Sequence, residues 1–386
     1  MHAFTCPSLV ITGDQGAPAK RARDLVGRFG RGELVELRDY FSPAWADTIA
    51  DRTAEVTNAI GDFLARVECE GGVPTAVAAN GEGEIAGVHY RIQGQGRAVV
   101  LMPLSLAPSQ WDPLLPRLSN HYSVIVLGGA HLGVISLLEA RARSGYGELV
   151  AQLLDRTDLA PGETVLEVGC GSGAVARALA NRLSSDNPVV ATDINPYILA
   201  EARALARDSG LLEAIKFEQA NAEALPYPDA HFDVAVCTTV LEEGDADRMV
   251  AELARVTRPG GRIAVLTRAI DVGWWTNLPV PGELKSRIEA LGSSTGAGVG
   301  DHGCADASLY ARLCKAGLTP SMMGPQFAIY RDGERLADVL DRLIGVLSES
   351  EARLCRNAIQ QAQMNGTLFV AEPFHCAVAT KGKRRP

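Results

Sequence analysis

Apolar runs alternate with amphipathic stretches along most of the chain. From residue 141 onward, a helix through "GYGELVAQLLDRTDL" and a turn at "APGE" precede a series of short apolar runs. Between the runs, apolar residues recur at helical spacing. The runs read "TVLEVG", "PVVATDI", "IKFEQAN", "FDVAVCT" and "GGRIAVLT". Strands that alternate with helices build parallel sheets covered by helices on both faces. The pattern therefore predicts an α/β domain over residues 141–386.

The C-terminal part of this domain is expected to complete the sheet. A pair of helical patterns follows "PSMMGPQFAIYR", and the chain then continues with "TLFVAEPFHCAVATKG". We expect this last stretch to form a final hairpin of two strand-like runs. The sheet is expected to have seven strands, and "PSMMGPQFAIYR" is a candidate for one of the two late strands.

The first 140 residues divide into two smaller α/β segments. Residues 1–72 read as strand, helix, strand and helix, and a linker-like "ECEGGVPTA" follows. Residues 73–140 begin with a hairpin-like pair of strands around Gly94 and Gly96, followed by a helix at "QWDPLLPRL" and a strand at "YSVIVL". The helix before the linker carries apolar residues at helical spacing, namely Ile49, Val56, Ile60, Phe63, Leu64 and Val67.

Composition narrows the class of protein. Of the 386 residues, 47% are hydrophobic and 22% are charged, as in soluble globular proteins. The net charge of −9 argues against nucleic acid and anionic membrane as partners. The eight cysteines are scattered without a Cys-x-x-Cys pair, which indicates reduced thiols and no zinc site. Because neither a signal-peptide pattern nor an apolar run of membrane-spanning length is present, we expect a cytoplasmic protein.

The stretch "TVLEVGCGSGAVARALA" carries a chemical signal. A strand, closely spaced glycines and a helix start are typical of a site for a nucleotide-like ligand. Gly169, Gly171 and Gly173 alternate, whereas the dinucleotide pattern is G-x-G-x-x-G. Glu167 would repel a pyrophosphate strongly in a low-dielectric cleft. The same carboxylate would attract the sulfonium and ammonium groups of S-adenosyl-L-methionine (SAM), so Glu167 favours SAM over NAD.

Three later segments extend this signal. Asp193 ends the second strand of the series, where a carboxylate can accept hydrogen bonds from both ribose hydroxyls of NAD or SAM. Asn221 follows the third strand and offers an amide to an adenine amine, with the backbone of Ala222 beside it. "RVTRPGGRIAV" supplies a helix end, a Pro-Gly-Gly turn and the fifth strand. The alternative is structural: the glycines permit a tight turn, and Asp193 caps a helix.

In this order, the four segments resemble the class I SAM-dependent methyltransferases, most of all the branch that holds the ubiquinone and menaquinone C-methyltransferases. The resemblance covers roughly residues 141–270 and implies a Rossmann-like sheet with SAM as the cofactor. Asn221 departs from the commoner Asp of the family but still offers an acceptor. The implied cofactor site has Glu167, Gly169, Cys170 and Gly171 at the methionine end, Asp193 and Ile194 at the ribose and adenine, Asn221 and Ala222 at the adenine edge, and Thr238 beneath the sulfonium.

Methyl transfer depends on in-line positioning, and a base helps only if the acceptor must lose a proton. Glu242 and Glu243 follow the fourth strand, and adjacent residues on a helix diverge, so at most one of them is expected to face the cleft. We take Glu243 and His302, which lies in "GAGVGDHGCADASLY", as candidate catalytic bases. The alternative for each is a solvated position at a helix end or in a loop.

In the resembled fold, the segment after the fifth strand commonly builds the acceptor pocket. Trp274 and Trp275 are candidate substrate-binding residues that offer flat apolar walls, with ordinary core packing as the alternative. The glycine-rich loop 292–303 is a candidate lid. Residues 292–296 also match the G-x-S-x-G pattern of hydrolase nucleophiles, but no apolar strand precedes them, so we interpret the match as chance.

The front of the chain shows a second resemblance. Residues 1–72 are similar to the closing segment of an α/β-hydrolase and residues 83–133 to its opening segment, in inverted order and without the nucleophile elbow. Asp14 matches the triad acid, but Phe41-Ser42-Pro43 stands where the triad histidine is expected. The resemblance implies a hydrolase-derived scaffold without catalysis. Such a scaffold would serve as a dimer interface, a lid or part of the acceptor pocket.

Three hypotheses about function stay open. The first is a methyltransferase that acts on an oxygen or carbon of a natural-product or quinone-like small molecule, with a nitrogen acceptor as its variant. The second is a SAM-binding scaffold without transfer activity, and the third is a hydrolase with a bound methyltransferase-like domain. Methylation of a nucleic-acid base is disfavoured because the fourth strand ends in Cys237-Thr238-Thr239-Val240, which lacks the Asn/Asp-Pro-Pro-aromatic motif. A homodimer through the N-terminal region is an expected assembly, and no metal is expected.

Overall fold

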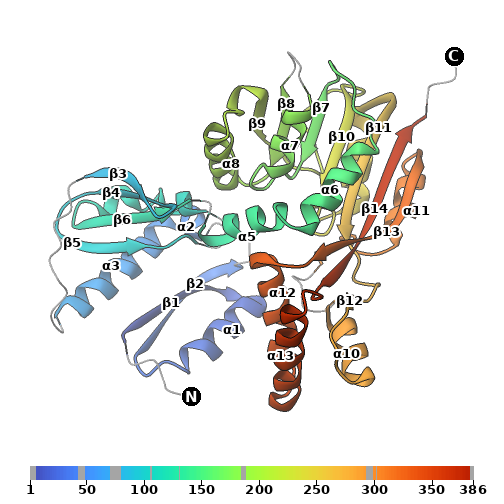
Figure 1. Ribbon diagram of the computed structural model, residues 1–386. Coiled ribbons are helices and arrows are strands. Elements are labelled where there is room, and N and C mark those ends of the chain that lie inside the picture. Colours follow the sequence, from blue (N-terminus) through green and yellow to red (C-terminus); the bar gives the residue numbers. More distant parts are fainter. Residues whose placement is uncertain are drawn as a thin grey trace. The chain divides into compact units, whose positions relative to one another are not determined.

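The computed structural model describes eight stretches of the chain: residues 6–41, 48–69, 80–104, 107–129, 131–183, 188–292, 299–300 and 302–382. The chain forms two compact units, Met1–Ser136 and Leu137–Pro386 (Figure 1). Each unit is described by itself below. Within the described stretches, no helix has both the length and the apolar character that crossing a bilayer requires.

The second unit is built on one mixed sheet. Its strands are β7 (Val165–Val168), β8 (Val189–Asp193), β9 (Ile215–Gln219), β10 (Phe232–Thr238), β11 (Thr257–Arg268), β12 (Trp275–Thr276), β13 (Leu318–Tyr330) and β14 (Val370–Lys381). They are ordered β12-β14-β11-β10-β7-β8-β9, and β13 also pairs with β14. Strands β7 to β11 run parallel, whereas β14 is antiparallel to β11 and to β13. The predicted α/β sheet is confirmed, with the two-residue strand β12 added to the seven expected.

Helices cover both faces of this sheet because alternate side chains of each strand point in opposite directions. Val234 and Val236 of β10 belong to the core on one face, and Ala235 and Cys237 belong to the core on the other. The first core receives α6 (Gly145–Asp155), α7 (Ala174–Arg182) and α8 (Pro196–Asp208), and the second receives α9 (Ala246–Val256) and α11 (Ser308–Lys315). The other helices are α5 (Gly133–Ala142), α10 (Gly282–Gly292), α12 (Gly333–Gly345), α13 (Glu349–Met364) and the 3-10 turn η2 (Leu212–Ala214).

The end of the sheet differs from its expected hairpin. "TLFVAEPFHCAVATKG" contributes a single strand, β14, and its partner is β13. Pro373 lies inside β14, although proline cannot donate a ladder hydrogen bond. In the structure Pro373 stands opposite Phe327, and its carbonyl accepts a hydrogen bond from the amide of Ala269 at 3.3 Å. The strand therefore continues through the proline, and the hairpin prediction was wrong.

The first unit holds two small sheets. In one, β1 (Ser8–Gln15) runs parallel to β2 (Gly32–Phe41). In the other, the order is β3 (Gly81–Ile85), β4 (Val88–Gln93), β6 (Tyr122–Gly128) and β5 (Arg97–Leu101). The helical elements are α1 (Gly16–Val26), α2 (Thr48–Asp51), α3 (Thr53–Cys69), η1 (Pro108–Trp111) and α4 (Leu115–Leu118).

The hairpin expected around Gly94 and Gly96 was wrong. The strands on either side of these glycines, β4 and β5, each pair with β6 and not with one another. Both glycines have positive φ values, 89° and 114°. A Cβ atom at Gly94 would lie 2.3 Å from the carbonyl oxygen of Tyr122, and one at Gly96 would lie 2.6 Å from that of His121. The glycines therefore let the chain pass close to the start of β6 and leave β4 for β5.

Asp14, the residue that matches a triad acid, supports the end of β2. Its carboxylate accepts hydrogen bonds from the amides of Asp39 at 3.0 Å and Tyr40 at 3.1 Å. These two bonds hold the pKa of Asp14 below its ordinary value. Phe41 ends β2, and residues 42 and 43 lie outside the described residues. The hydrolase resemblance of this unit stays a prediction.

Candidate functional site

The carboxyl ends of the parallel strands β7, β8, β10 and β11 share one edge of the sheet, where ligands bind in open α/β folds. The chain leaves β7 through the glycine turn, residues 169–173, and enters α7. Gly169, Gly171 and Gly173 all have positive φ values, of 72°, 53° and 75°. A Cβ atom at Gly169 would lie 2.1 Å from Cγ2 of Val240, which follows β10. The turn therefore requires glycine for its backbone conformation and, at Gly169, for space.

Cys170 holds the middle of this turn to the neighbouring strand. Its amide donates to the carbonyl of Thr192 at 2.8 Å, and its own carbonyl accepts from the amide of Gly173 at 2.8 Å. The side chain is buried, and this burial raises the pKa of the Cys170 thiol well above its ordinary value. Cys170 thus holds the turn in place through its backbone, and its buried thiol acts as a neutral, apolar side chain.

Glu167 is the buried acid of the site. It lies on β7 with 1% of its surface exposed, and its Oε2 has no hydrogen-bond partner in the part of the chain that the structure describes. Burial, reinforced by the nearby Asp193, raises the pKa of Glu167 to about 8, although Arg177 opposes the shift. An unsatisfied buried carboxyl oxygen is costly, so a donor or cation from a ligand would stabilise it. This atom fits the ammonium or sulfonium groups of SAM.

Asp193 links the glycine turn to the next strand. At the end of β8, its two carboxylate oxygens accept hydrogen bonds from the amides of Gly171 and Asn195, each at 3.0 Å. Burial raises its pKa, and the backbone hydrogen bonds limit the shift. Asn195, not Asp193, caps the following helix α8, because its side chain accepts from the amides of Tyr197 and Ile198. Each carboxylate oxygen keeps further acceptor capacity, which a ribose hydroxyl could use.

The residues expected around adenine follow β8 and β9. Ile194 is 62% exposed, an unusual position for a large apolar side chain beside a buried acid. Asn221 is exposed, and its side-chain oxygen accepts from the amide of Glu223 at 2.8 Å. Ala222 is half-buried next to it. The side chain of Asn221 is therefore fixed by its own turn before any ligand binds.

Thr238 is the last residue of β10 and is 6% exposed. The next residue, Thr239, has a φ of 56°, and its hydroxyl accepts from Nη2 of Arg141 at 3.0 Å. Left-handed backbone at a non-glycine residue is uncommon and recurs at functional sites. Thr239 is therefore the point at which the chain turns away from β10.

A cavity of about 300 Å³ opens beside these residues, within the size range of small-molecule pockets. We call it the acceptor cavity. Leu138 lies at both sites, because it lines this cavity and its Cδ1 would be 3.3 Å from a Cβ atom on Gly171. The cavity is lined by Leu138, Arg141, Thr239, Glu242, Glu243, Arg268, Ala269, Ile270, Trp274, Arg335, Arg342, Glu372, Pro373 and Phe374.

Glu242 and Glu243 both line the acceptor cavity, so the expectation that one at most would face it was wrong. The reason is local: α9 begins only at Ala246, with Asp245 as its cap, and the two glutamates lie in the preceding turn. Helical divergence of neighbouring side chains therefore does not apply to them.

The two glutamates differ in what they contact. Glu242 is 3% exposed, forms an ion pair with the Arg268 side chain and accepts from the Arg268 amide at 2.6 Å and the Thr267 hydroxyl at 3.1 Å. Glu243 forms no ion pair of this kind among the residues that the structure describes. Partial burial and the charge of Glu242 raise the pKa of Glu243, and Arg268 opposes the shift. Glu242 thus has a structural role, whereas the carboxylate of Glu243 is available to accept a proton.

The two tryptophans occupy different surroundings. Trp274 is 7% exposed and lines the acceptor cavity. Trp275 is 57% exposed, does not line it, and packs edge-on against Phe369 at 5.4 Å between ring centroids. His302 is also exposed and lies outside the lining; its backbone has a φ of 66°, and its carbonyl accepts from the amide of Ala246 at 3.2 Å. Residues 293–298 and 301 of the expected lid lie outside the described residues.

Four arginines that sequence reasoning missed line the acceptor cavity: Arg141, Arg268, Arg335 and Arg342. Arg335 binds Glu372 at 3.0 Å and Asp338 at 2.8 Å, and Arg342 binds Asp338 at 3.0 Å. Arg335, Asp338 and Arg342 recur at the spacing of one helix face, which was a readable signal of a charged stripe on α12. No local pattern pointed to Arg141 or Arg268.

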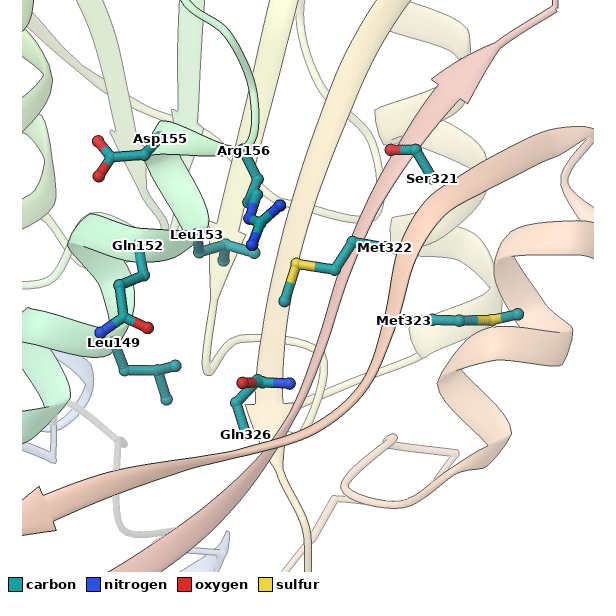
Figure 2. Close-up of a pocket in the computed structure, with 9 residues that line it drawn as sticks. All are labelled: Leu149, Gln152, Leu153, Asp155, Arg156, Ser321, Met322, Met323 and Gln326. Carbon is teal, nitrogen blue, oxygen red and sulfur yellow. The ribbon is translucent and has the colours of Figure 1, made fainter.

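A second, open groove of about 570 Å³ lies between α6 and the first half of β13. Figure 2 shows Met322 directed toward Arg156 and Leu153, while Met323 points to the other side of the strand. Its lining contains no residue of the glycine turn and none that follows β8 or β10. This groove is therefore separate from the candidate site.

Comparisons with known proteins find similarity over part of the second unit. Residues 165–261 match the family model described as a methyltransferase domain. The ubiquinone/menaquinone biosynthesis C-methyltransferase of Hahella chejuensis is 34% identical over 142 residues, which cover 34% of this chain and 57% of that protein. The enzyme of the same name from Vibrio vulnificus is 35% identical over 114 residues, which cover 29% of this chain and 44% of that protein.

The chain thus spans about half of the length of these relatives. Among solved structures, a geranyl diphosphate C-methyltransferase from Streptomyces coelicolor is 15% identical with a TM-score of 0.38, covering 61% of this chain and 79% of that one. The family match and the two relatives lie on the segment that holds the glycine turn, Asp193, Asn221 and Thr238.

Proposed function

We propose, from the premise that residues 165–261 form a class I SAM-dependent methyltransferase domain, that this chain transfers a methyl group from SAM to a small-molecule acceptor. The methylated atom is an oxygen or a carbon. The observation that carries the proposal is the adjacency of the two sites. The glycine turn and the acceptor cavity share Leu138, so a reacting acceptor and the cofactor would meet without a further domain.

The residues at the edge of the sheet have separate roles in this proposal. When bound, SAM supplies an electrophilic methyl group on a sulfonium. Glu167 would hold the positively charged methionine end, and Gly169 and Gly171 would let the backbone approach it. Asp193 would bind the ribose, and Ile194, Asn221 and Ala222 would surround the adenine. Thr238, with its buried position at the end of β10, would close the site beneath the sulfonium.

The acceptor side supplies orientation and a base. Trp274 and Phe374 offer aromatic walls that hold a flat apolar body in line with the methyl group, and alignment alone is worth about 7–11 kcal/mol of barrier. Glu243 would accept the proton of a phenol, enol or carbon acid, since its raised pKa makes it a better base than an ordinary glutamate. If the methylated atom were a nitrogen instead, a catalytic base would be needed least. His302 and Trp275 lie outside the cavity lining, and their roles stay predictions.

The proposal is tested by incubating the protein with methyl-labelled SAM and an extract of the producing cells, followed by mass spectrometry of small molecules. We expect one labelled product. Glu243→Gln should lower its rate of formation by about 10²-fold while SAM binding is retained. Glu148→Gln, which changes an exposed glutamate on α6, is the matched control and should leave the rate unchanged. SAM binding without any labelled product would favour the non-catalytic scaffold instead.

The remaining expectations extend this proposal. A cytoplasmic location is supported by the seven described cysteines, which are all free and of which five are buried. The net charge of −9 supports a small-molecule acceptor over nucleic acid or an anionic membrane. We also propose that the first unit is a non-catalytic scaffold and that it mediates a homodimer. Gel filtration with light scattering of the full chain and of residues 137–386 would test the dimer.

A further inference from the structure

The charges that line the acceptor cavity are matched in pairs, except for those of Arg141 and Glu243. Glu242 neutralises Arg268, Glu372 neutralises Arg335, and Asp338 binds both Arg335 and Arg342. Arg141 alone among the four cavity arginines has no carboxylate partner in the described part of the chain. Its recorded contacts are the Thr239 hydroxyl, at 3.0 Å, and the ring of Tyr146, 4.1 Å beneath the guanidinium.

These contacts orient Arg141 without neutralising it. A guanidinium has five N–H donors, and the bond to Thr239 uses one of them. Stacking on Tyr146 holds the planar group by its face and leaves its edges for hydrogen bonds. Tyr146 is itself fixed, because it is 3% exposed and packs edge-on against Phe374 at 5.3 Å. The cavity therefore presents a positive charge in a set orientation.

The helix that carries Arg141 is also fixed against the cofactor turn. Glu139, two residues before Arg141 on α5, accepts hydrogen bonds at both carboxylate oxygens from Nη2 of Arg177 on α7, at 2.7 and 2.8 Å. Arg177 also donates to the carbonyl of Ser172 within the glycine turn, at 2.8 Å. Charge-assisted hydrogen bonds of this kind are stronger than neutral ones. Arg141 thus has a defined position relative to the place where the methyl group would be delivered.

We propose that Arg141 binds an anionic group of the acceptor, so that the substrate class is an organic acid, a carboxylate on a flat apolar body. The apolar lining fits such a body: Leu138, Ile270, Trp274 and Phe374 face the same cavity. A planar guanidinium matches a carboxylate with two parallel hydrogen bonds, which a neutral amide cannot reproduce. This inference rests on the proposed function, since it names the substrate of the same site.

The carboxylate of the cofactor's own methionine is the other source of this chemistry, and the experiment separates the two. The full-length protein is saturated with S-adenosyl-L-homocysteine, the product of methyl transfer, and titrated with 2-naphthoate or with its neutral isostere 2-naphthamide. Calorimetry reports binding. We expect 2-naphthoate to bind at least tenfold more tightly than 2-naphthamide.

Arg141→Met should abolish this tenfold preference and leave the affinity for S-adenosyl-L-homocysteine unchanged. Arg141→Lys keeps the positive charge but lacks the planar guanidinium, so it should retain part of the preference. This conservative variant keeps the test valid if Arg141→Met does not fold. Arg143→Met is the matched control, because Arg143 is exposed on the same segment and lines no part of the cavity. It should behave as the wild type.

The inference is overturned if the wild type shows no preference for 2-naphthoate, or if it binds neither probe. It is also overturned if Arg141→Met weakens S-adenosyl-L-homocysteine binding while the preference persists, since Arg141 would then serve the cofactor. Failure of the proposed function looks different: either S-adenosyl-L-homocysteine does not bind to the wild type, or no labelled product forms from SAM.

Discussion

The two halves of the candidate site are built in different ways. The cofactor half, formed by the glycine turn with Glu167 and Asp193, consists of backbone conformations and of residues near the carboxyl ends of two adjacent strands. The acceptor cavity consists of side chains from α5, α12, β14 and the segments after β10 and β11. The first half depends on local geometry, and the second depends on long-range packing. A site that depends on local geometry can be predicted from the sequence, whereas a site that depends on long-range packing cannot.

The two halves also differ in what stabilises them. Three alternating positive φ values, at Gly169, Gly171 and Gly173, and close approaches of neighbouring side chains define the glycine turn. Ion pairs among buried or half-buried groups define the acceptor cavity. Steric changes should therefore damage the first half, and charge changes should damage the second.

The largest effect is expected in the acceptor cavity, at Glu242. Glu242→Ala removes a 4% exposed carboxylate from the guanidinium of Arg268, which is 18% exposed, and loss of one partner of a buried pair costs about 3–5 kcal/mol. The free energy of unfolding, measured with urea, should fall by that amount. Glu243→Ala is the matched control in the adjacent position and should cost less than about 1 kcal/mol. Equal losses in both variants would contradict the division into a structural and a reactive glutamate.

The next effect is steric and belongs to the glycine turn. Gly169→Ala places a Cβ atom 2.1 Å from Val240 at a left-handed position, and strain plus overpacking should cost about 2–4 kcal/mol. Gly171→Ala shares the positive φ but meets its nearest atom only at 3.3 Å, so about 1–2 kcal/mol is expected. Urea unfolding of the two variants gives the difference. If Gly171→Ala cost as much as Gly169→Ala, the close approach to Val240 would not be what constrains the turn.

A smaller effect is expected on cofactor affinity. Asp193→Ala should weaken SAM binding by about 1–3 kcal/mol through lost charge-assisted hydrogen bonds. Calorimetry with SAM measures it. Asp193→Asn keeps one acceptor oxygen for the amides of Gly171 or Asn195 and separates a ligand effect from collapse of the turn. Unchanged SAM affinity in Asp193→Ala would count against the cofactor assignment.

Much of the second unit could be predicted because its signals are local. Alternating apolar residues such as those of β10 set the two faces of a strand, and the glycines at 169, 171 and 173 are needed for positive φ. Asp193 ends β8 and Asn221 lies two residues beyond β9, so the parallel order of β7, β8 and β9 brings them to one edge. Nothing beyond strand order is needed to assemble this half.

The rest could not be predicted because it depends on partners far apart in the chain. The hairpin expected in the last stretch fails because β13 supplies one long partner strand for the whole of β14. The hairpin at Gly94 fails because β6, which comes later, pairs with both flanking strands. Arg141 and Arg268 stand in unremarkable sequence, and only the fold brings them to one cavity. Glu242 shows the same limit, since its ion pair and the start of α9 were both invisible in the local pattern.

The smallest expected effect is the pH dependence that the Glu167 carboxyl gives to the free energy of unfolding. It belongs to the cofactor half of the site. Its pKa is raised from 4.5 to about 8 in the folded chain, so between these values the unfolded state has released a proton that the folded state retains. Stability must then fall as pH rises through this window and level off above pH 8. The wild type should lose about 1 kcal/mol of this contribution between pH 7 and pH 8.

Glu167→Gln cannot titrate, so the difference in unfolding free energy between wild type and variant isolates this group from all others. Any constant penalty for a buried amide shifts the difference by the same amount at every pH. A cationic ligand favours the ionised carboxylate, and SAM binding at pH 7 should therefore release a proton from the wild type that the variant does not release. Calorimetry in two buffers of different ionisation enthalpy measures that release. A difference curve that is flat from pH 5 to pH 9 would show that Glu167 is ionised throughout, and the unpartnered Oε2 would then be satisfied by a group already in the folded chain.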